Sequence, residues 1–217
     1  MQRLDAHAIH RLGIPRLLLM DHAGLALARA VRDLLPASAK RPVLACCGTG
    51  YNGGDGLAAL RHLHAWGYAV RALIAGRRGR LREEPAVFAR ILDRLGVPVR
   101  DAATAGSVRQ AGAWVSGAGA VIDALLGIGA EGPPREPAAS LIARINRAGC
   151  PVVCADVPSG LDADTGQAPG AVVQGTVTVA FGAVKRGCQR RAARLWTGRV
   201  VVDPITMPSA LLRGRAR

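Results

Sequence analysis

The sequence predicts an α/β protein with a Rossmann-like, doubly wound and mostly parallel sheet that has helices on both faces. Short apolar runs typical of buried strands alternate with segments of helical periodicity, and this alternation indicates βαβ crossovers. The 217 residues suffice for one such three-layer αβα sandwich but are few for two independent domains. We therefore expect one domain over residues 1–210 and a basic tail at 211–217.

The first expected elements are a helix, a buried strand, a second helix and a second strand. Apolar side chains recur every three or four positions over residues 19–35, and Pro36 ends this amphipathic helix. Residues 43–47 form a continuous apolar run that leads into a glycine cluster, which is typical of a strand buried on both faces. Helical spacing returns over residues 56–66, and an alternating pattern predicts a strand at 68–75.

The remainder of the chain continues the alternation with less regular patterns. Proline opens two of the expected helices, and alanine and glycine blur the one between them. These helices are expected at residues 85–95, within 102–119 and at 137–148, and the further strands at 97–99, 120–126, 151–155, 177–181 and 200–202.

The N-terminal segment and the cysteines predict a cytoplasmic protein. Residues 1–15 alternate polar and apolar side chains without the apolar stretch of a signal peptide, and residues 17–20 are too few to span a bilayer. The five cysteines include no C-x-x-C pair and have no histidine at zinc-ligand spacing. We interpret them as reduced side chains, packed like small hydrophobic residues.

The chain is strongly basic, with a formal net charge of +14, and 27 of its 29 basic residues are arginine. Nucleic acid and a phosphorylated small ligand would both satisfy such a charge, which can equally reflect composition alone. An aromatic content of 3% argues against modules that stack bases on exposed rings. We interpret the cluster of Arg77, Arg78, Arg80 and Arg82 as a solvated loop that also lies near where a ribose 2′-phosphate would sit.

A glycine-rich segment at residues 48–56 joins the first buried strand to a helix. Its five glycines leave backbone N–H groups and a helix N-terminus free to face a diphosphate. The segment contains G-x-G-x-x-G, but the acidic residue that usually holds a ribose hydroxyl after the second strand is absent. A standard NAD dehydrogenase is therefore disfavoured, and the lack of G-K-[ST] excludes a P-loop.

Two aspartates belong to later strands. Asp123 lies within an apolar strand that leads into a Gly-x-Gly loop, and Asp156 lies at the end of a buried strand, before a tight Pro-Ser-Gly turn. Each has a structural alternative, because Asp123 can cap loop backbone and Asp156 can form an Asx turn. The carboxyl ends of parallel strands meet at one edge, which would bring oxygen ligands together without a His or Cys shell. Oxygens of Asn52, Asp123 and Ser159 would suit an alkali or alkaline-earth ion, and their low charge favours a monovalent one.

Taken with two further segments, these motifs resemble those of the NAD(P)HX epimerase family, also called the YjeF N-terminal domain. Residues 19–24 (LMDHAG) resemble the family's L-M-E-N-A-G, and residues 48–56 (GTGYNGGDG) its G-x-G-N-N-G-G-D-G. Residues 156–166 resemble D-x-P-S-G-L-x-x-D-T-G, and residues 176–187 resemble T-V-T-F followed by K-x-G. The resemblance spans nearly the whole chain.

The resemblance implies an isomerase that interconverts the R and S epimers of hydrated NADH and NADPH, a repair of damaged nicotinamide nucleotides. It implies one K⁺ per subunit on Asn52, Asp123 and Ser159, a homodimer, and a separate nucleotide-dependent dehydratase in the same pathway. The implied substrate-binding residues are Tyr51, Asn52, Gly53, Gly54, Asp55, Gly127, Ile128, Gly129, Ala130, Glu131, Gly132, Pro133 and Asp156.

In a chemically sensible mechanism, the ring nitrogen expels the C6 hydroxyl while a carboxylate moves its proton. Asp156 is the expected catalytic acid/base, with Asp55 as the runner-up, and Lys185 either stabilises anionic charge or forms a structural ion pair. The chain departs from the family at Tyr51, where the family has asparagine, and we assign no role beyond surface or packing to His62. The alternatives are a noncatalytic module that binds nucleotide or RNA, and an ordinary dinucleotide oxidoreductase.

Overall fold

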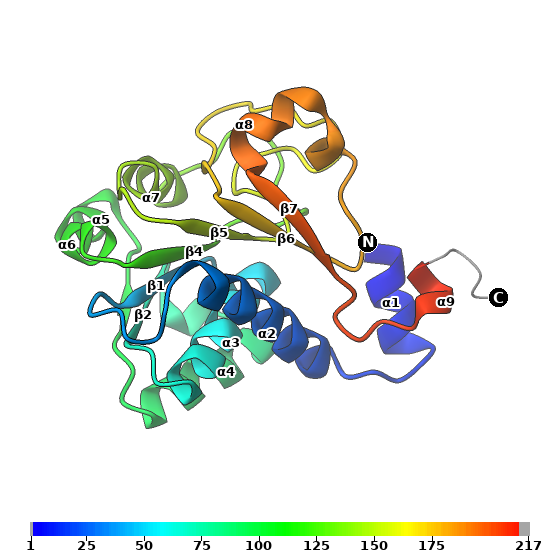
Figure 1. Cartoon of the computed structure of the whole chain (residues 1–217), viewed down its shortest axis with the longest axis horizontal. Coiled ribbons are helices and arrows are strands. Elements are labelled where there is room, and N and C mark those ends of the chain that lie inside the picture. Colours follow the sequence, from blue (N-terminus) through cyan, green and yellow to red (C-terminus); the bar gives the residue numbers. More distant parts are fainter. Residues whose placement is uncertain (1, 213–217) are drawn as a thin grey trace.

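The protein is built on a seven-stranded sheet in which every neighbouring pair of strands is parallel (Figure 1). The computed structural model describes residues 2–212. The strand order is β3-β2-β1-β4-β5-β6-β7. The strands are β1 (Val43–Cys47), β2 (Val70–Ile74), β3 (Val99–Asp101), β4 (Ala120–Ala124), β5 (Val152–Ala155), β6 (Val177–Phe181) and β7 (Arg199–Asp203).

Helices connect the strands and flank the sheet. They are α1 (Gln2–His10), α2 (Arg16–Leu34), α3 (Tyr51–Ala65), α4 (Glu83–Arg94), α5 (Ala105–Gln110), α6 (Gly112–Ser116), α7 (Ala138–Ile145), α8 (Arg194–Thr197) and α9 (Ser209–Leu212). The 3₁₀ turns are η1 (Arg78–Arg80), η2 (Gly187–Gln189) and η3 (Arg191–Ala193). No helix in residues 2–212 is long and apolar enough to cross a membrane.

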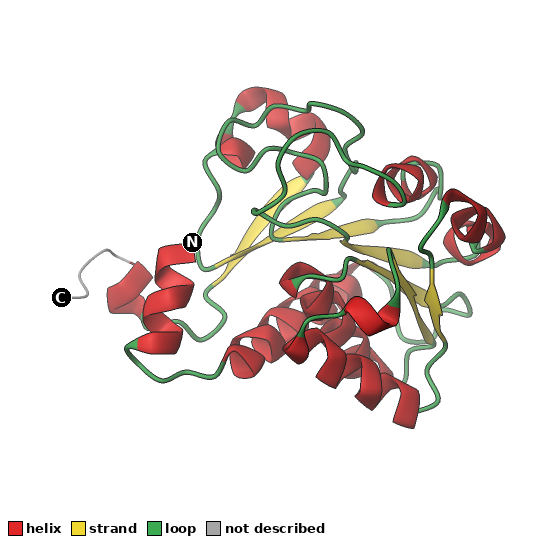
Figure 2. Ribbon diagram, turned by 180° about the vertical axis from the view of Figure 1, so that it is seen from behind, coloured by secondary structure: helices red, strands yellow, loops and turns green. Residues whose placement is uncertain are grey.

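Helices cover both faces of the sheet, which confirms the predicted three-layer architecture (Figure 2). All five residues of β1 are buried, as its continuous apolar run predicts. Alternate side chains of a strand point to opposite faces. Val43 and Ala45 therefore pack with α2, α3 and α4, whereas Leu44 and Cys46 pack with α5, α6 and α7.

The strand order reverses between β1 and β4, which are direct neighbours. The chain moves outward from β1 through β2 to β3, then returns to β4 and continues to β7. The loops that follow β1 and β4 consequently diverge and leave a crevice at the carboxyl ends of the strands. In open α/β sheets this crevice is the usual ligand site.

Helix α3 begins at Tyr51, five residues before the start that its apolar spacing predicts. Residues 51–56 of the glycine-rich motif thus belong to the start of the helix, and only residues 48–50 form a loop ahead of it. Glycine is a poor helix former, but here it permits close packing of α3 against its neighbours. A Cβ atom at Gly54 would lie 2.8 Å from the Met20 Cε, and one at Gly24 of α2 would lie 2.7 Å from the backbone of Ala58.

The N-terminal segment and the expected tail also differ from their predictions. The alternating pattern of residues 1–15 gives no helix signal, yet α1 forms and packs Ala8 into the core beside Leu4 and Ile9. Helices α1 and α9 lie next to each other at the edge of the molecule in both ribbon views (Figures 1 and 2). Leu211, the expected first tail residue, is buried in α9, and residues 213–217 lie outside the described range.

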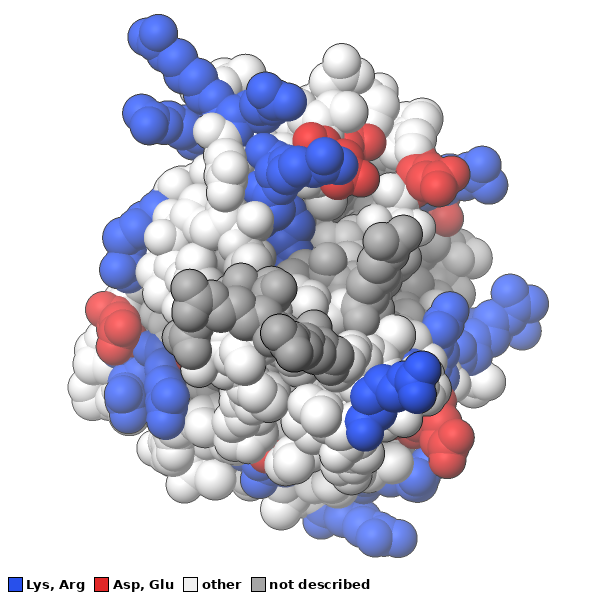
Figure 3. All heavy atoms as spheres, turned by 90° about the vertical axis from the view of Figure 1, so that its right-hand side faces the viewer, with Lys and Arg blue, Asp and Glu red and all other residues white. Residues whose placement is uncertain are grey.

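The basic residues are spread over the face shown in Figure 3 rather than joined into one stripe. Acidic side chains lie between several of the arginine and lysine side chains at its periphery. A continuous basic track is the electrostatic signature of a nucleic-acid site. The described residues on this face form no such track.

Candidate active site

A cleft of about 750 Å³ lies at the carboxyl ends of the strands, where the strand order reverses. Its walls come from the segments after β1, β4 and β5 and from helices α1, α2 and α3. The volume falls within the range that small-molecule and cofactor sites occupy. The topology therefore places the cleft where an α/β sheet binds its ligand.

Asp156 and Lys185 form a buried ion pair that lines this cleft. Oδ1 of Asp156 accepts hydrogen bonds from Lys185 Nζ and from the Phe181 N–H, the latter at 2.9 Å. Lys185 Nζ also donates to the Phe181 carbonyl at 2.9 Å. Burial raises the pKa of the Asp156 carboxyl, and the Lys185 ammonium opposes that rise.

The backbone of Asp156 has a φ of 69°, in the left-handed region that residues other than glycine rarely adopt. This conformation follows directly after β5, with the Asp156 N–H still donating to Val179 of β6 at 2.9 Å. Aspartate and asparagine enter the region more readily than other side chains. The turn thereby aims the carboxylate into the cleft.

Two further carboxylates line the cleft, Asp55 from α3 and Asp5 from α1. Burial raises the pKa of Asp55 well above its usual range, and the Asp156 carboxylate raises it further. Burial and the Asp156 charge also raise the pKa of Asp5. The three acids thus share a site with one lysine, which favours keeping a proton on a carboxyl group.

The first turn of α3 presents backbone donors to the cleft. No hydrogen bond within residues 2–212 uses the N–H groups of Tyr51, Asn52 and Gly53, and no side chain caps the helix. Gly48 has no room for a Cβ, which would collide with the Leu125 carbonyl of the neighbouring segment. The glycine segment therefore combines close packing with a free helix N-terminus, a suitable arrangement for binding an anion.

Two of the three expected metal ligands, Asn52 and Ser159, contact the backbone of Leu126, and the third, Asp123, bonds to Ser159. Nδ2 of Asn52 donates to the Leu126 carbonyl at 3.1 Å, and Ser159 Oγ lies 3.3 Å from the same oxygen. Asp123 is fully buried and accepts from the Ser159 hydroxyl at 2.6 Å and from its N–H at 2.8 Å. Burial raises the pKa of Asp123, and the Ser159 hydrogen bonds oppose the rise.

This set fits a hard monovalent cation in its chemistry. Its donors are oxygens with a single carboxylate charge, provided the Asn52 amide turns its oxygen inward. Residues 2–212 contain no group of three or more His, Cys, Asp or Glu side chains placed to hold a metal. The same contacts also serve the structural alternative, since Asp123 accepts from the Leu125 N–H at 3.3 Å and so caps the loop after β4.

Most of the expected substrate-binding residues line the cleft. Those that do are Tyr51, Asn52, Gly53, Asp55, Gly127, Ile128, Gly129, Ala130 and Asp156. Gly54 instead packs under the helix against Met20 and Pro85, and Glu131, Gly132 and Pro133 are exposed beyond the cleft. The sequence interpretation missed the contributions of α1, among them Asp5 and His10, which only the spacing of Leu4, Ala8 and Ile9 would have indicated.

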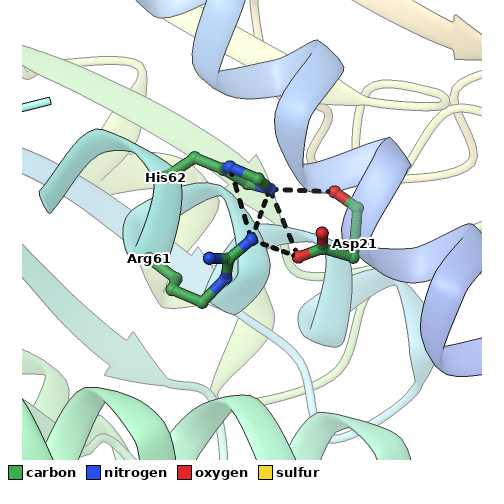
Figure 4. Close-up of polar contacts among 3 residues, drawn as sticks. All are labelled: Asp21, Arg61 and His62. Atoms are coloured by element: carbon green, nitrogen blue, oxygen red, sulfur yellow. Dashed lines mark hydrogen bonds and ion pairs between the residues drawn. The ribbon is translucent and has the colours of Figure 1, made fainter. Parts of the chain in front are cut away.

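Asp21, where the family pattern has glutamate, takes part in a polar cluster away from the cleft (Figure 4). Its carboxylate accepts from Arg61 Nη2 at 2.6 Å, and Nε2 of His62 lies 3.2 Å from its backbone carbonyl. Burial and the Arg61 charge lower the pKa of His62. The cluster joins α2 to α3, in agreement with the packing role expected for His62.

Comparison with known proteins identifies the family. The family described as "YjeF-related protein N-terminus" matches residues 16–187. The chain belongs to this family. An NAD(P)H-hydrate epimerase of Limosilactobacillus fermentum is 37% identical over 93% of this chain and 92% of its own length.

Other members extend the likeness in sequence and in structure. A bifunctional NAD(P)H-hydrate repair enzyme of Pyrobaculum aerophilum is 44% identical over 91% of this chain, and this chain spans 39% of its length. The crystal structure of the yeast protein ynu0 superposes with a TM-score of 0.77 at 25% identity, covering 93% of this chain and 84% of that one. This chain therefore shares its fold with the yeast protein.

Proposed function

We propose that this protein is an NAD(P)HX epimerase, which interconverts the R and S epimers of hydrated NADH and NADPH. One observation carries the proposal, namely the buried Asp156–Lys185 pair that lines, together with Asp55, a cleft at the sheet's switch point. Relatives of this chain carry the name NAD(P)H-hydrate epimerase, which supports the same reaction. The free N–H groups at the start of α3 would bind the phosphates of such a dinucleotide.

The reaction exchanges configuration at C6 without a change of redox state. The lone pair of the ring nitrogen forms a C=N bond as the C6–O bond breaks, and a carboxylic acid protonates the departing hydroxyl to give water. Water then adds to either face of the C=N bond and returns its proton to the carboxylate. We assign this carboxyl to Asp156, with Asp55 as the alternative.

Lys185 acts in this proposal as a positioning residue. Its ammonium bonds both Asp156 and the Phe181 carbonyl, which orients the carboxylate toward the cleft. These two contacts favour the ion pair over direct stabilisation of charge on the substrate. The ammonium also stabilises the carboxylate after its proton has left.

The proposal includes one K⁺ per subunit, held by oxygens of Asn52, Asp123 and Ser159. These residues connect the segments after β1, β4 and β5 through Leu126. A bound ion would supply electrostatic cohesion among these three segments. The chain's own residues carry the proton transfer.

A homodimer and a separate dehydratase that consumes one epimer remain part of the proposal, as does a cytoplasmic location.

The decisive experiment starts from the purified R epimer of NADHX. The protein is added, and the appearance of the S epimer is followed by chromatography with and without K⁺. Rapid approach to an equilibrium mixture supports the proposal, whereas a rate equal to the spontaneous one rejects it. Oxidation or reduction of the nicotinamide ring in the same assay would instead indicate an oxidoreductase.

The noncatalytic alternative predicts a different result in the same preparation. A module that binds RNA would retain a labelled oligonucleotide at physiological salt. It would leave the rate of epimer conversion equal to the spontaneous rate. The basic charge alone motivates this alternative, and the described residues on the face in Figure 3 form no continuous basic track.

A further inference from the structure

Two arginine side chains at the cleft gather over one aromatic ring. Arg16 begins α2 and Arg82 precedes α4, and both line the cleft with Tyr51. The guanidinium carbons lie 4.3 Å and 4.4 Å from the centroid of the Tyr51 ring. The two positive charges are therefore no farther apart than about twice that distance, and the ring face stabilises each of them.

These two guanidinium groups keep most of their hydrogen-bonding capacity free. The closest acid to Arg16 is Glu84, whose Oε1 is 3.9 Å from the Arg16 Nε, beyond hydrogen-bond length. The side chain of Arg82 makes no hydrogen bond or ion pair within residues 2–212. Two like charges beside a cleft, of which Arg16 alone has an acid within 4 Å among residues 2–212, favour an anionic ligand.

Arg78 shows the opposite behaviour in the same arginine cluster. Its Nη1 donates to both carboxylate oxygens of Asp93 at 2.8 Å, and its Nη2 donates to the Val99 carbonyl at 2.9 Å. It does not line the cleft, and neither does the exposed Arg80. The four arginines expected to lie near a 2′-phosphate thus do not act as one group, because Arg82 alone among them lines the cleft.

The surroundings of the ring suit a phosphate group. Tyr51 is the first residue of α3, so the unused N–H groups of that helix begin at the same position. The Arg82 N–H donates to the Thr49 carbonyl at 3.2 Å, which fixes the Arg82 segment to the glycine motif. Planar guanidinium groups bind phosphate through paired N–H donors.

We propose that Arg16 and Arg82, held over Tyr51, form an arginine clamp that binds a phosphate group of the dinucleotide. The tyrosine that replaces the family's asparagine then has a function, since its ring is the platform on which both arginines rest. This inference rests on the proposed function and adds a subsite to it. The diphosphate and the ribose 2′-phosphate share the required chemistry.

The test compares Arg16→Gln, Arg82→Gln and the double variant with Arg80→Gln as the matched control. Equilibrium dialysis gives the Kd of equilibrated NADHX and NADPHX mixtures, and the epimerisation assay gives kcat and KM. Each clamp variant should raise Kd and KM about tenfold with kcat nearly unchanged, as expected for loss of a charge-assisted hydrogen bond. Arg80→Gln should match the unaltered protein.

The two hydrates distinguish the source of the phosphate. Weakening of NADPHX alone assigns the clamp to the 2′-phosphate, and equal weakening of both hydrates assigns it to the diphosphate. Tyr51→Ala keeps both arginine charges but removes the aromatic ring on which they rest. This variant should also raise KM for whichever hydrates the arginine variants weaken.

Unchanged Kd values in a folded double variant would overturn the clamp while the proposed function stands. If the unaltered protein binds neither hydrate, the proposed function fails, and the clamp fails with it.

Discussion

Replacing Asp156 by asparagine removes the acidic proton of the proposed catalytic acid while preserving the geometry of the side chain. The asparagine carbonyl can accept the same bonds from the Phe181 N–H and from Lys185 that Oδ1 of Asp156 accepts. Asparagine also tolerates the left-handed backbone at this position, where φ is 69°. A loss of activity in this variant would therefore report chemistry rather than a displaced turn.

The expected magnitudes follow from these contacts. General acid–base catalysis contributes about 10²- to 10⁴-fold, so kcat for epimerisation should fall by a factor in that range with a smaller change in KM. Removing one partner of a buried ion pair costs about 3–5 kcal/mol. Because the amide keeps two hydrogen bonds to its neighbours, we expect a loss of unfolding free energy of about 3 kcal/mol or less.

The assay follows conversion of purified R-NADHX to the S epimer, and chemical denaturation measures stability. Asp55→Asn is the matched control because it removes a carboxyl group from the same cleft and leaves the Lys185 ion pair intact. Full activity in folded Asp156→Asn, together with its loss in Asp55→Asn, would refute the assignment and make Asp55 the acid.

Four other predictions concern stability and the ion. Ser159→Ala should lower the unfolding free energy by about 2 kcal/mol, because buried Asp123 loses the hydroxyl that donates at 2.6 Å; urea denaturation measures this, and an unchanged midpoint would contradict it. Gly24→Ala should destabilise by about 1–3 kcal/mol, since the added methyl would lie 2.7 Å from the backbone of Ala58; a rise in melting temperature would argue against the close packing of α2 on α3. The pKa of Asp55 is raised in the folded protein, which therefore binds that proton more tightly than the unfolded chain, so this contribution to stability should fall as pH rises from about 4 through the folded-state pKa; denaturation at a series of pH values should show a shallower decline for Asp55→Asn, and identical slopes would disprove the coupling. Exchange of K⁺ for a tetraalkylammonium ion should lower both melting temperature and activity, and Ser159→Ala should reduce the difference between the two ions; equal behaviour in both ions would speak against the site.

The sequence predicted the sheet closely because its strands are buried on both faces. A continuous apolar run between Pro42 and Gly48 gives β1 the same limits in the sequence and in the structure. Edge strands lack that signal, and β3 forms at residues 99–101 rather than 97–99. Val99 is the only apolar residue of β3, and hydrogen bonding to β2 extends the strand through the polar Arg100 and Asp101.

The candidate site was predictable where a motif lies in or directly after a strand, as at Asp123 and Asp156, and at Asp55 in the glycine motif that follows β1. The early start of α3 was not, because glycine opposes helix formation locally and close tertiary packing overrides that preference. Asp5 was also missed, since the pattern of residues 1–15 was interpreted as alternating rather than helical, and α1 reaches the cleft only by packing in three dimensions. The choice between two roles for Lys185 required the contacts with Asp156 and Phe181.

The central position of β1 has a consequence for synthesis on the ribosome. β1 bonds to β2 on one side, but its other neighbour, β4, starts only at residue 120. A nascent chain that has folded up to β3 would expose the unpaired N–H and C=O groups of β1 beside its apolar side chains, and such an edge invites association with other chains. Slow translation before residue 120 should therefore increase aggregation, whereas rapid delivery of β4 should protect the growing protein.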